Sequence, residues 1–569
     1  MDPAHIAPGL FLIKKMKNCI LAFILVLSGS SFSQQTVGLF QYTQDAFPGY
    51  TLFAPGRSET TYLIDNCGHL QYSWQSAFLT GGSVELMENG SIMRACQFEN
   101  GSPLTGGGAS GRIEVVRKDQ QIEWEFEYSN DSVRLHHDFE ILPNGNVLMI
   151  AWELKTQQEA IDEGRDPLIV GGSGLWPEHI IEYNPTLDSV IWRWNAWDHL
   201  IQDFDNTKSN FGVIADYPEL FNLNFDKGNG AADWQHVNSI DYNESLDQIL
   251  ISSPAWNEVY IIDHSTTTSE AATHTGGASG KGGDILWRWG NPAQYEAGDS
   301  NDIQLFFQHD AHWIPSGYPH GDKIILFNNG KDRVPDEYST VEIIQPSILP
   351  NGDYEIGANN QFLPVSSDYT YTAPNPTDFY SRIISSADML PNGNIIIDEG
   401  TSGHFFEIDS LENIVWDYVN PVVADSILAQ EQVIPGTANL FNLTFRARRI
   451  AYDFVGVEAL PLFDQGPLER NPYTDNCDDG LTLKEKYLFD FVVYPNPSNG
   501  VINIRLKDAH TFSKVELMDP QGRLILEKSI EESPSNSSIV LSQERLFSGM
   551  YMIRLSNERG FFIKRILVD

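Results

Sequence analysis

Short hydrophobic runs that alternate with polar residues and end at tight turns recur along most of the chain. Five of these runs share one register: GSVELMENG (82–90), HDFEILPNG (137–145), HVNSIDYNE (236–244), HDAHWIPSG (309–317) and SSADMLPNG (385–393). Period-two alternation before Asn-Gly, Pro-Asn-Gly and Ser-Gly turns is typical of antiparallel β-strands. Segments long enough for a helix lack a convincing helical period. We therefore predict an all-β chain.

Each opening run is followed by a second hydrophobic run and then by a segment that closes in an aromatic residue. The closing segments are YLIDNCGHLQYSW (62–74), IEVVRKDQQIEWEF (113–126), IIEYNPTLDSVIWRW (180–194), VYIIDH…DILWRW (259–289), FFEIDSLENIVWDY (405–418) and, as a weaker copy ending at Tyr354, VEIIQPSILPNGDYEI (341–356). With GYTLFAP (49–55) as a degenerate sixth opening run, the pattern predicts a six-bladed β-propeller. An array of β-sandwiches is the alternative, but it gives no reason for six copies of one pattern.

The C-terminal residues follow a different pattern. Alternating strands from FVVYPNPSNGVINIRL (491–506) onward predict a small β-sandwich domain over 487–569. The polar stretch 465–486 predicts a linker between this domain and the propeller, which we place at 34–464.

The N-terminal residues predict export. MKNCILAFILVLSGSSFSQ (16–34) has a basic start, an apolar centre and a small-residue end, which are typical of a signal peptide. The apolar centre is too short for a stable membrane span. We therefore predict a signal peptide over 1–33, with Met16 as the true start.

Net charge limits the binding partners of the chain, and its cysteines limit the possible disulfides. The chain has 77 acidic and 36 basic residues, a formal charge of −41, which argues against nucleic acid and anionic membrane surfaces. A small anionic substrate stays open, because salt screens surface charge within about 8 Å. Cys67, Cys96 and Cys477 remain after signal cleavage. A Cys67–Cys96 disulfide is one option, and it leaves an odd thiol.

Three histidines occupy equivalent positions of the repeat. The residue seven places before the Asn or Ser of each turn is Gly82, His137, His236, His309 or Ser385. The first strand of each propeller blade lines the central channel, so we expect these residues to form a ring. Strand alternation places Asn238 on the same face as His236. Imidazoles gathered in this way can bind an anion, coordinate a metal or act as a nucleophile.

Longer motifs around these positions resemble the aryl-sulfate sulfotransferases. They are HHDFEILPNGN, DWQHVNSIDYN, GGDILWRWGNP, QHDAHWIP with ILFNNG, and LPNGNIIIDEGTSGHFFEID, within residues 50–460. The resemblance implies a propeller that moves a sulfuryl group from a phenolic sulfate donor to a phenolic acceptor, without a nucleotide donor, cofactor or metal. It implies that His309 forms a covalent sulfohistidine, that His236 and His137 assist it, and that Asn238 and Ser385 contact the substrate.

The chemistry of imidazole agrees with this function. The oxygens of a sulfate monoester repel anionic nucleophiles, whereas neutral imidazole carries no charge. A covalent intermediate divides one difficult transfer into two easier steps. Protonated histidines beside the nucleophile can neutralise the sulfuryl oxygens and protonate the leaving phenolate.

One departure from the family pattern keeps other functions open. The family has an arginine in an SSR run where this chain, in LISSPAWNEV, has Pro254. The fixed cation is then missing or comes from elsewhere, for example from Arg382 or Arg446. The alternatives are a metal-dependent sulfate or phosphate ester hydrolase that uses the three histidines, and an inactive propeller that serves as a binding or adhesion module.

The C-terminal motifs YPNPSNG, GRLIL and SGMYMIRL resemble the type A sorting domain of the type IX secretion system. The resemblance implies the type IX machinery as a partner, a secreted or cell-surface location, and later removal of the domain. Between the propeller motifs, HSTTTSEAATHTGGASGKGG (264–283) predicts a flexible loop. We expect His199 to be a loop or blade-edge residue.

Overall fold

The structure is a computed structural model that describes most of the predicted propeller and part of the C-terminal domain. The described residues are 35–225, 230–424, 426–435, 442–473, 477, 491–494, 501–506, 514–518, 523–529, 538–542, 546, 549–557 and 560–568. The predicted signal peptide lies outside them and stays a prediction.

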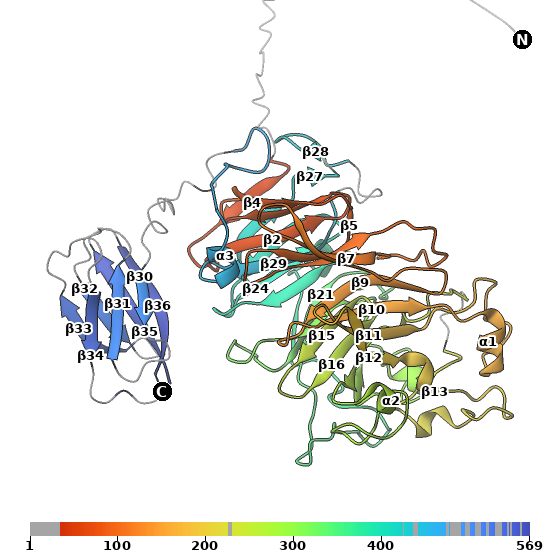
Figure 1. Ribbon diagram of the computed structural model, residues 1–569. Helices are drawn as coiled ribbons and strands as arrows, with labels where there is room; N and C mark the ends of the chain where they lie inside the picture. The colour runs from red at the N-terminus through yellow and green to blue at the C-terminus, as the bar shows by residue number, and fades with distance from the viewer. Residues whose placement is uncertain are drawn as a thin grey trace, which may run out of the picture.

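Antiparallel sheets packed side by side form the first domain (Figure 1). The five predicted opening runs are the inner strands β5 (Thr80–Leu86), β9 (Val133–Ile141), β15 (Ser239–Asn243), β19 (His309–Trp313) and β23 (Ser386–Met389). Three strands follow each inner strand outward in chain order. They are β6 (Ile92–Gln97), β7 (Gly111–Val116) and β8 (Ile122–Glu127); β10 (Val147–Glu153), β11 (Glu178–Asn184) and β12 (Ser189–Asn195); β16 (Gln248–Ser253), β17 (Glu258–Asp263) and β18 (Trp287–Trp289); β20 (Ile324–Asn328), β21 (Thr340–Ile344) and β22 (Tyr369–Tyr371); and β24 (Ile395–Glu399), β25 (His404–Ile408) and β26 (Ile414–Val419).

Both ends of the domain contribute to its closure. β29 (Thr444–Ala451) is the inner strand of a further unit and pairs with β2 (Gly49–Pro55), which continues to β3 (Thr60–Ile64) and β4 (Leu70–Gln75). β1 (Gly38–Tyr42) adds to the outer edge of the last unit by pairing with β26. Strands from the beginning and end of the domain therefore interlock twice, as the neighbouring red and turquoise strands of Figure 1 show.

The inner strands contact one another in a closed cycle. Within the described part of the chain, the cycle runs from β29 through β5, β9, β15, β19 and β23 and back to β29. The predicted β-propeller is confirmed, and the number of six blades stays a prediction that this cycle supports. The assignment of GYTLFAP (49–55) was wrong: it forms the second strand of its unit, because β29 takes the inner place.

The fourth strand of the unit that begins at β19 also differs from the prediction. β21 pairs with β22, whereas residues 345–356 form a loop with one isolated bridge between Ile348 and Tyr354. Tyr354 is buried, and its ring centroid lies 6.3 Å from that of Trp287 in the preceding unit. The aromatic residue that the pattern assigned to a strand therefore packs between units.

Short helices and small ladders complete the described residues of the propeller. The α-helices are too short to produce a helical period in the sequence. They are α1 (Gln157–Asp162), α2 (Thr268–Ala271) and α3 (Val455–Glu458); the 3-10 helices are η1 (Ala196–Asp198), η2 (Ile214–Asp216), η3 (Pro254–Trp256), η4 (Pro292–Tyr295) and η5 (Pro376–Asp378); the ladders pair β13 (Leu200–Ile201) with β14 (Phe221–Asn222) and β27 (Val422–Val423) with β28 (Ser426–Ile427).

The tryptophans that close the repeats are buried in the core. The side chains of Trp74, Trp194 and Trp416 have no exposed surface. Indole N–H groups need a partner when buried, and that of Trp416 donates to the carbonyl of Asn66 at 2.8 Å. Burial of these large rings explains why the sequence repeat ends in an aromatic residue.

Buried carboxylates on the inner strands are neutralised by arginines of β29. Arg446 donates to Asp138 at 2.9 and 2.6 Å, and Arg448 donates to Asp310 at 3.0 and 2.8 Å. Arg446 Nε also lies 2.7 Å from Asp310. Because a buried charge without its partner is costly, closure by β29 and neutralisation of these aspartates depend on each other.

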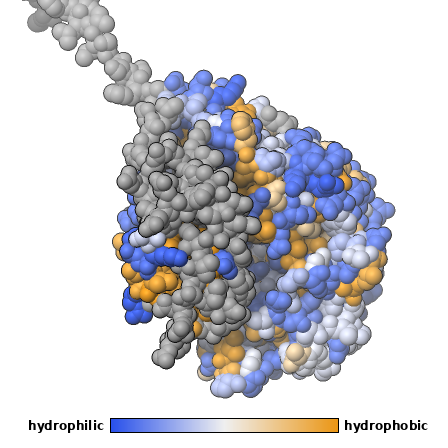
Figure 2. All heavy atoms as spheres, turned by 60° about the vertical axis from the view of Figure 1, so that its left-hand side comes forward, coloured by the Kyte–Doolittle hydropathy of each residue, from blue (hydrophilic) through white to orange (hydrophobic). Residues whose placement is uncertain are grey.

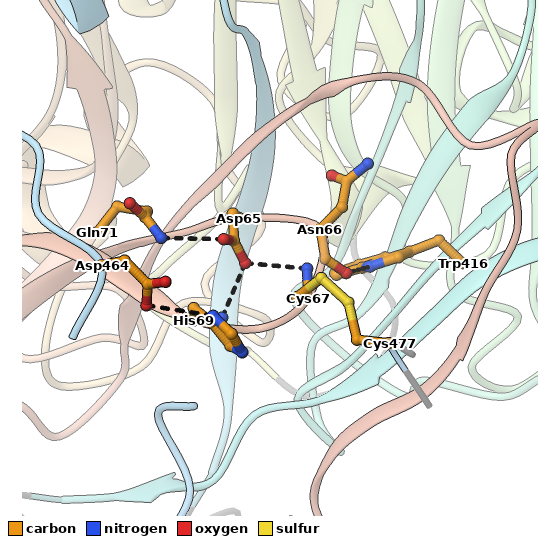
Figure 3. Close-up of a disulfide and its surroundings, with 8 residues drawn as sticks. All are labelled: Asp65, Asn66, Cys67, His69, Gln71, Trp416, Asp464 and Cys477. Atoms are coloured by element: carbon orange, nitrogen blue, oxygen red, sulfur yellow. Dashed lines mark hydrogen bonds and ion pairs between the residues drawn. A yellow bond between two sulfur atoms is a disulfide. The ribbon is translucent and has the colours of Figure 1, made fainter. Parts of the chain in front are cut away.

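A disulfide joins Cys67 to Cys477, with Cα atoms 5.7 Å apart (Figure 3). The Cys67–Cys96 pairing was wrong, because Cys96 lies buried in β6 as a free thiol. Asp65 fixes the turn around Cys67, since its carboxylate accepts the backbone N–H groups of Cys67 and His69, both at 2.9 Å. The bond therefore fastens part of the predicted linker to the propeller.

Replacement of Cys477 by serine is expected to lower the stability of the propeller. The disulfide closes a loop of 410 residues, and loss of such a bond typically costs about 2–4 kcal/mol. Thermal unfolding of the variant and of the wild type would measure the difference. The wild type under a reductant should unfold like the variant, and equal midpoints for oxidised wild type and variant would contradict the expectation.

The C-terminal domain is a separate set of strands that confirms the predicted all-β unit (Figure 1). One sheet holds β30 (Phe491–Tyr494), β31 (Val501–Leu506) and β34 (Ser538–Ser542), and the other holds β33 (Leu524–Ser529), β32 (Lys514–Met518), β35 (Gly549–Asn557) and β36 (Gly560–Val568). Apolar residues from both sheets, among them Ile504, Val515 and Ile553, form one buried cluster.

Hydrophilic residues cover most of the described surface in Figure 2, and hydrophobic residues appear there in separate patches. This surface is consistent with the formal charge of −41. Among the helices of the described residues, none has the length and apolar character that a membrane span requires.

Candidate active site

The structure brings together His137, His236 and His309, which we call the imidazole cluster. The ring centroids of His137 and His236 lie 4.8 Å apart. The ring of Phe445 lies 6.0 Å from that of His137 and 6.4 Å from that of His309. The ring of Phe307 lies 6.1 Å from that of His236 and 5.8 Å from that of His309. The cluster therefore combines three imidazoles with two phenyl rings.

The backbone is unusual at two of the three positions of the imidazole cluster. His137 and His236 have φ values of 54° and 53°, and Ser385, at the equivalent position, has 99°. Non-glycine residues rarely adopt such values, which concentrate at functional sites. At the equivalent position in the unit that begins at β5, a Cβ on Gly82 would collide with the carbonyl of His137. This contact explains why glycine stands there instead of histidine.

Asn329 determines the tautomer of His309. The amide nitrogen of Asn329 donates to the carbonyls of Ser381 and Ile384, both at 2.7 Å, so its oxygen faces His309 Nδ1 at 2.8 Å. Nδ1 therefore carries the proton and Nε2 the lone pair, which accepts the backbone N–H of Ile384 at 3.2 Å. Burial lowers the pKa of His309 to about 3, so the ring is neutral at physiological pH.

His236 has a carboxylate partner instead. Its Nδ1 donates to Asp233 Oδ2 at 2.5 Å, and 17% of its side chain is exposed. Burial lowers the pKa of His236, but the charge of Asp233 and its hydrogen bond outweigh this effect, and the net pKa is raised. His236 is therefore the member of the cluster that favours the imidazolium form.

His137 lies at the end of a buried hydrogen-bonded chain. His136 joins Glu178 Oε2 at 2.7 Å to His137 Nδ1 at 2.9 Å. Burial raises the pKa of Glu178 well above its usual value, and burial also lowers the pKa values of both histidines. With all three groups neutral, the Glu178 hydroxyl donates to His136, His136 donates to His137, and His137 keeps its proton on Nε2. His137 is then a neutral donor.

A glycine-rich segment, Gly106–Gly108, lies against the cluster. A Cβ on Gly108 would collide with the ring of His137, and a Cβ on Gly107 would lie 3.4 Å from His236 Cε1. A Cβ on Gly106 would lie 2.8 Å from Asp233 Oδ2. Side chains at Gly106 and Gly108 would displace Asp233 or His137, so glycine at these two positions has a local structural reason.

Asn238 and Ser385 lie near the cluster but make other contacts. Asn238 is buried and donates to the carbonyl of Gln308, directly before His309, at 2.8 Å. The hydroxyl of Ser385 donates to Ser381 at 2.8 Å and accepts the N–H of Gly400 at 3.0 Å. Asn238 therefore holds the start of β19, and the predicted substrate contacts of both residues stay predictions.

Lys331 is a cation near the cluster that sequence reasoning missed. Pro254 begins η3 and is buried, Arg446 is paired with Asp138 and Asp310, and Arg382 is exposed. Lys331 Nζ lies 3.9 Å from the ring centroid of Phe307, and its charge acts on His236. Burial lowers the pKa of Lys331.

The partners of the imidazoles were also missed, although most of them lie within motifs that the sequence displays. Asn329 and Lys331 belong to NNGK, Asp233 to DWQH, and His136 to the HH pair. Only Glu178 comes from a segment without a recognisable motif. A search for polar residues within the same motifs would have found the others.

The described residues contain a group of potential metal ligands elsewhere. His199, His274 and Asp284 have ligand atoms within 4.8 Å of one another. His199 is fully buried and follows η1 in the loop after β12, the outer strand of its unit, which agrees with its expected place at a loop or blade edge. The alternatives of a metal-dependent hydrolase and of an inactive binding module stay untested.

The fold and site define a class: a β-propeller that gathers, at its inner strands, imidazoles with different hydrogen-bond partners. The chain belongs to the arylsulfotransferase family, because the family model described as "Arylsulfotransferase (ASST)" matches residues 42–432. This membership supports aryl sulfotransferase activity. A second model, "Secretion system C-terminal sorting domain", matches residues 492–569, which indicates export, a surface or extracellular location, and interaction with the secretion machinery.

Among curated proteins, no sequence matches the chain significantly. A protein of unknown function from Bacteroides caccae is similar in structure, with a TM-score of 0.37 and 11% identity over 71% of this chain and 99% of its own. Virginiamycin B lyase from Staphylococcus aureus has a TM-score of 0.29 and 9% identity over 69% and 90%. Likenesses at this level say nothing about the activity of this chain.

Proposed function

We propose that the protein transfers a sulfuryl group from a phenolic sulfate ester to a phenolic acceptor, with His309 as the nucleophile. The observation that carries this proposal is the set of partners at Nδ1 of the imidazole cluster. An amide holds His309, a carboxylate holds His236, and a neutral imidazole holds His137. The lone pair of His309 Nε2 is thereby accompanied by N–H donors on His236 and His137.

The difference between Asn329 and Asp233 separates the roles. A carboxylate beside His309 would favour its protonation and remove the lone pair. The amide of Asn329 fixes the ring without adding charge. Asp233, in contrast, stabilises the imidazolium of His236, which can donate a proton to a leaving phenolate. Neighbouring groups thus adapt one residue type to a nucleophile and to an acid.

In the first half of the reaction, His309 Nε2 attacks sulfur and the bond between sulfur and the aryl oxygen breaks. The leaving oxygen takes the Nε2 proton of His236, which becomes neutral. The backbone N–H of Ile384, which donates to Nε2 at 3.2 Å, can then donate its hydrogen bond to an oxygen of the incoming sulfuryl group instead. The first phenol leaves, and the sulfuryl group stays on His309.

In the second half, the acceptor phenol attacks the same sulfur and gives its proton to His236. The nitrogen–sulfur bond breaks, and His309 recovers its lone pair. His309 keeps its proton on Nδ1 throughout, hydrogen-bonded to Asn329, so the sulfonated ring carries a positive charge. The imidazole of His309 is therefore a good leaving group. Phe307 and Phe445, beside the imidazoles, offer aromatic surface to both phenols.

The direct test combines a chromogenic donor with a second phenol. The protein is incubated with 4-nitrophenyl sulfate with and without the acceptor, and nitrophenolate and sulfated acceptor are measured. Release that requires the acceptor is the expected result. Release into water alone would indicate a hydrolase, and no release from folded protein would favour a binding module; both results contradict the proposal.

Replacement of Lys331 by alanine is expected to lower kcat/KM for the donor about tenfold or more, because a cation beside developing negative charge would be lost. Lys331→Arg should keep most of the activity. Lys323→Ala is a matched control at the start of the same hairpin, where Lys323 pairs with Asp368 at 2.9 Å. Equal kinetics of Lys331→Ala and this control would contradict a role for Lys331.

A further inference from the structure

Two histidines meet one buried carboxylate in the loop between β17 and β18. Asp284 Oδ1 lies 2.7 Å from His199 Nδ1 and 2.8 Å from His274 Nδ1. His199, which follows η1, is fully buried, whereas 60% of the His274 side chain is exposed. The predicted flexible loop is therefore connected to the adjacent blade at this point.

The hydrogen bonds leave too few protons for these contacts. His199 Nε2 lies 2.8 Å from the carbonyl of Ala271, which only accepts, so the proton of a neutral His199 is on Nε2. The lone pair of Nδ1 then faces a carboxylate oxygen. A second proton on His199 would satisfy this contact, and so would a metal ion.

We propose that His199, His274 and Asp284 bind one Zn²⁺ ion. Two imidazole nitrogens and one carboxylate oxygen form a common zinc donor set. The bond from His199 Nε2 to a backbone carbonyl is the outer contact that usually orients a metal-bound histidine. Ligands of tetrahedral zinc lie about 3.4 Å apart, given bonds of about 2.0–2.1 Å. The two contacts with Asp284 would each widen by about 0.6–0.7 Å. The exposed His274 can move for one of them, and a shift of Asp284 provides the other.

The surroundings provide both support and access. The ring of Trp194 is parallel to that of His199, with centroids 5.8 Å apart, and its N–H donates to Gly283 beside Asp284 at 2.7 Å. A pocket of about 490 Å³ is lined by His274, Asp284 and Glu219, among others. A fourth ligand, water or Glu219, can enter from this pocket. The ion would hold the loop against the blade.

The test measures zinc alone. Protein without a polyhistidine tag is stripped with a chelator, titrated with ZnCl₂ by calorimetry, and its bound zinc is counted. We expect one equivalent, and a higher unfolding temperature with zinc. His274→Ala, which replaces an exposed residue and preserves the fold, should weaken binding at least tenfold and abolish the thermal shift.

Two controls identify the site. His320→Ala removes another exposed histidine and should bind zinc like the wild type. His236→Ala should also keep the equivalent, because the imidazole cluster is a different group. Absence of tight binding in the wild type would overturn the proposal. Loss in His236→Ala together with retention in His274→Ala would do so as well, and would move the ion to the imidazole cluster.

Discussion

Replacement of His309 by alanine is expected to reduce sulfuryl transfer about 10³-fold or more, because it removes the only group to which the covalent intermediate is assigned. Turnover of 4-nitrophenyl sulfate with a phenolic acceptor measures the loss. Mass spectrometry of wild-type protein incubated with donor alone should find one added sulfuryl group on the peptide that contains His309. The variant should lack this group.

Two comparisons make this result specific. His309→Asn keeps a polar side chain of smaller size and should be as inactive as His309→Ala. His320→Ala should be fully active, and circular dichroism should show that all three variants are folded. Near-normal turnover by His309→Ala would show that the nucleophile has been assigned wrongly.

Replacement of His236 by alanine is expected to lower kcat about 10²–10³-fold, because the proton donor and its positive charge disappear together. The loss should be greater for donors whose phenols have a high pKa, since these leaving groups depend most on protonation. Rates for a series of substituted aryl sulfates measure this dependence. An equal loss for all donors would contradict the role of His236 as an acid.

The pH profile tests the same role without removing the ring. The pKa of His236 is raised, so the imidazolium persists to a higher pH than that of an ordinary histidine, and activity falls as the pH rises through that pKa. His309 has a pKa lowered to about 3 and keeps its lone pair well into the acidic range. Asp233→Asn lowers the pKa of His236 and should move the alkaline limit to lower pH. An unchanged limit would show that another group titrates there.

The sequence predicted the propeller and the imidazole cluster for the same reason. In a propeller, equivalent residues of successive inner strands lie at the same level around the central axis, so three histidines at the same position of the repeat come close together. The inner position of β29 could not be predicted in this way, because GYTLFAP resembles an opening run and the true inner strand lies at the other end of the domain. The Cys67–Cys477 bond was missed because it joins positions that are close only after this closure.

The charge states of the imidazoles could not be derived from the repeat. They depend on Asn329, Asp233 and Glu178, which lie at different distances in sequence from the rings that they contact. The repeat places equivalent residues, but the differences between equivalent residues come from their neighbours. His199 shows the same limit, since its carboxylate partner lies 85 residues away.

The origin of β29 has a consequence for how the chain acquires its native state. Arg446 and Arg448 are among the last propeller residues to leave the ribosome, whereas Asp138 and Asp310 emerge much earlier. Until the late strand inserts, these acidic side chains have no counterions from it, and a C-terminally truncated product cannot supply them. The propeller therefore closes only when these arginines neutralise the aspartates, and the imidazole cluster forms only after nearly the whole domain has been synthesised.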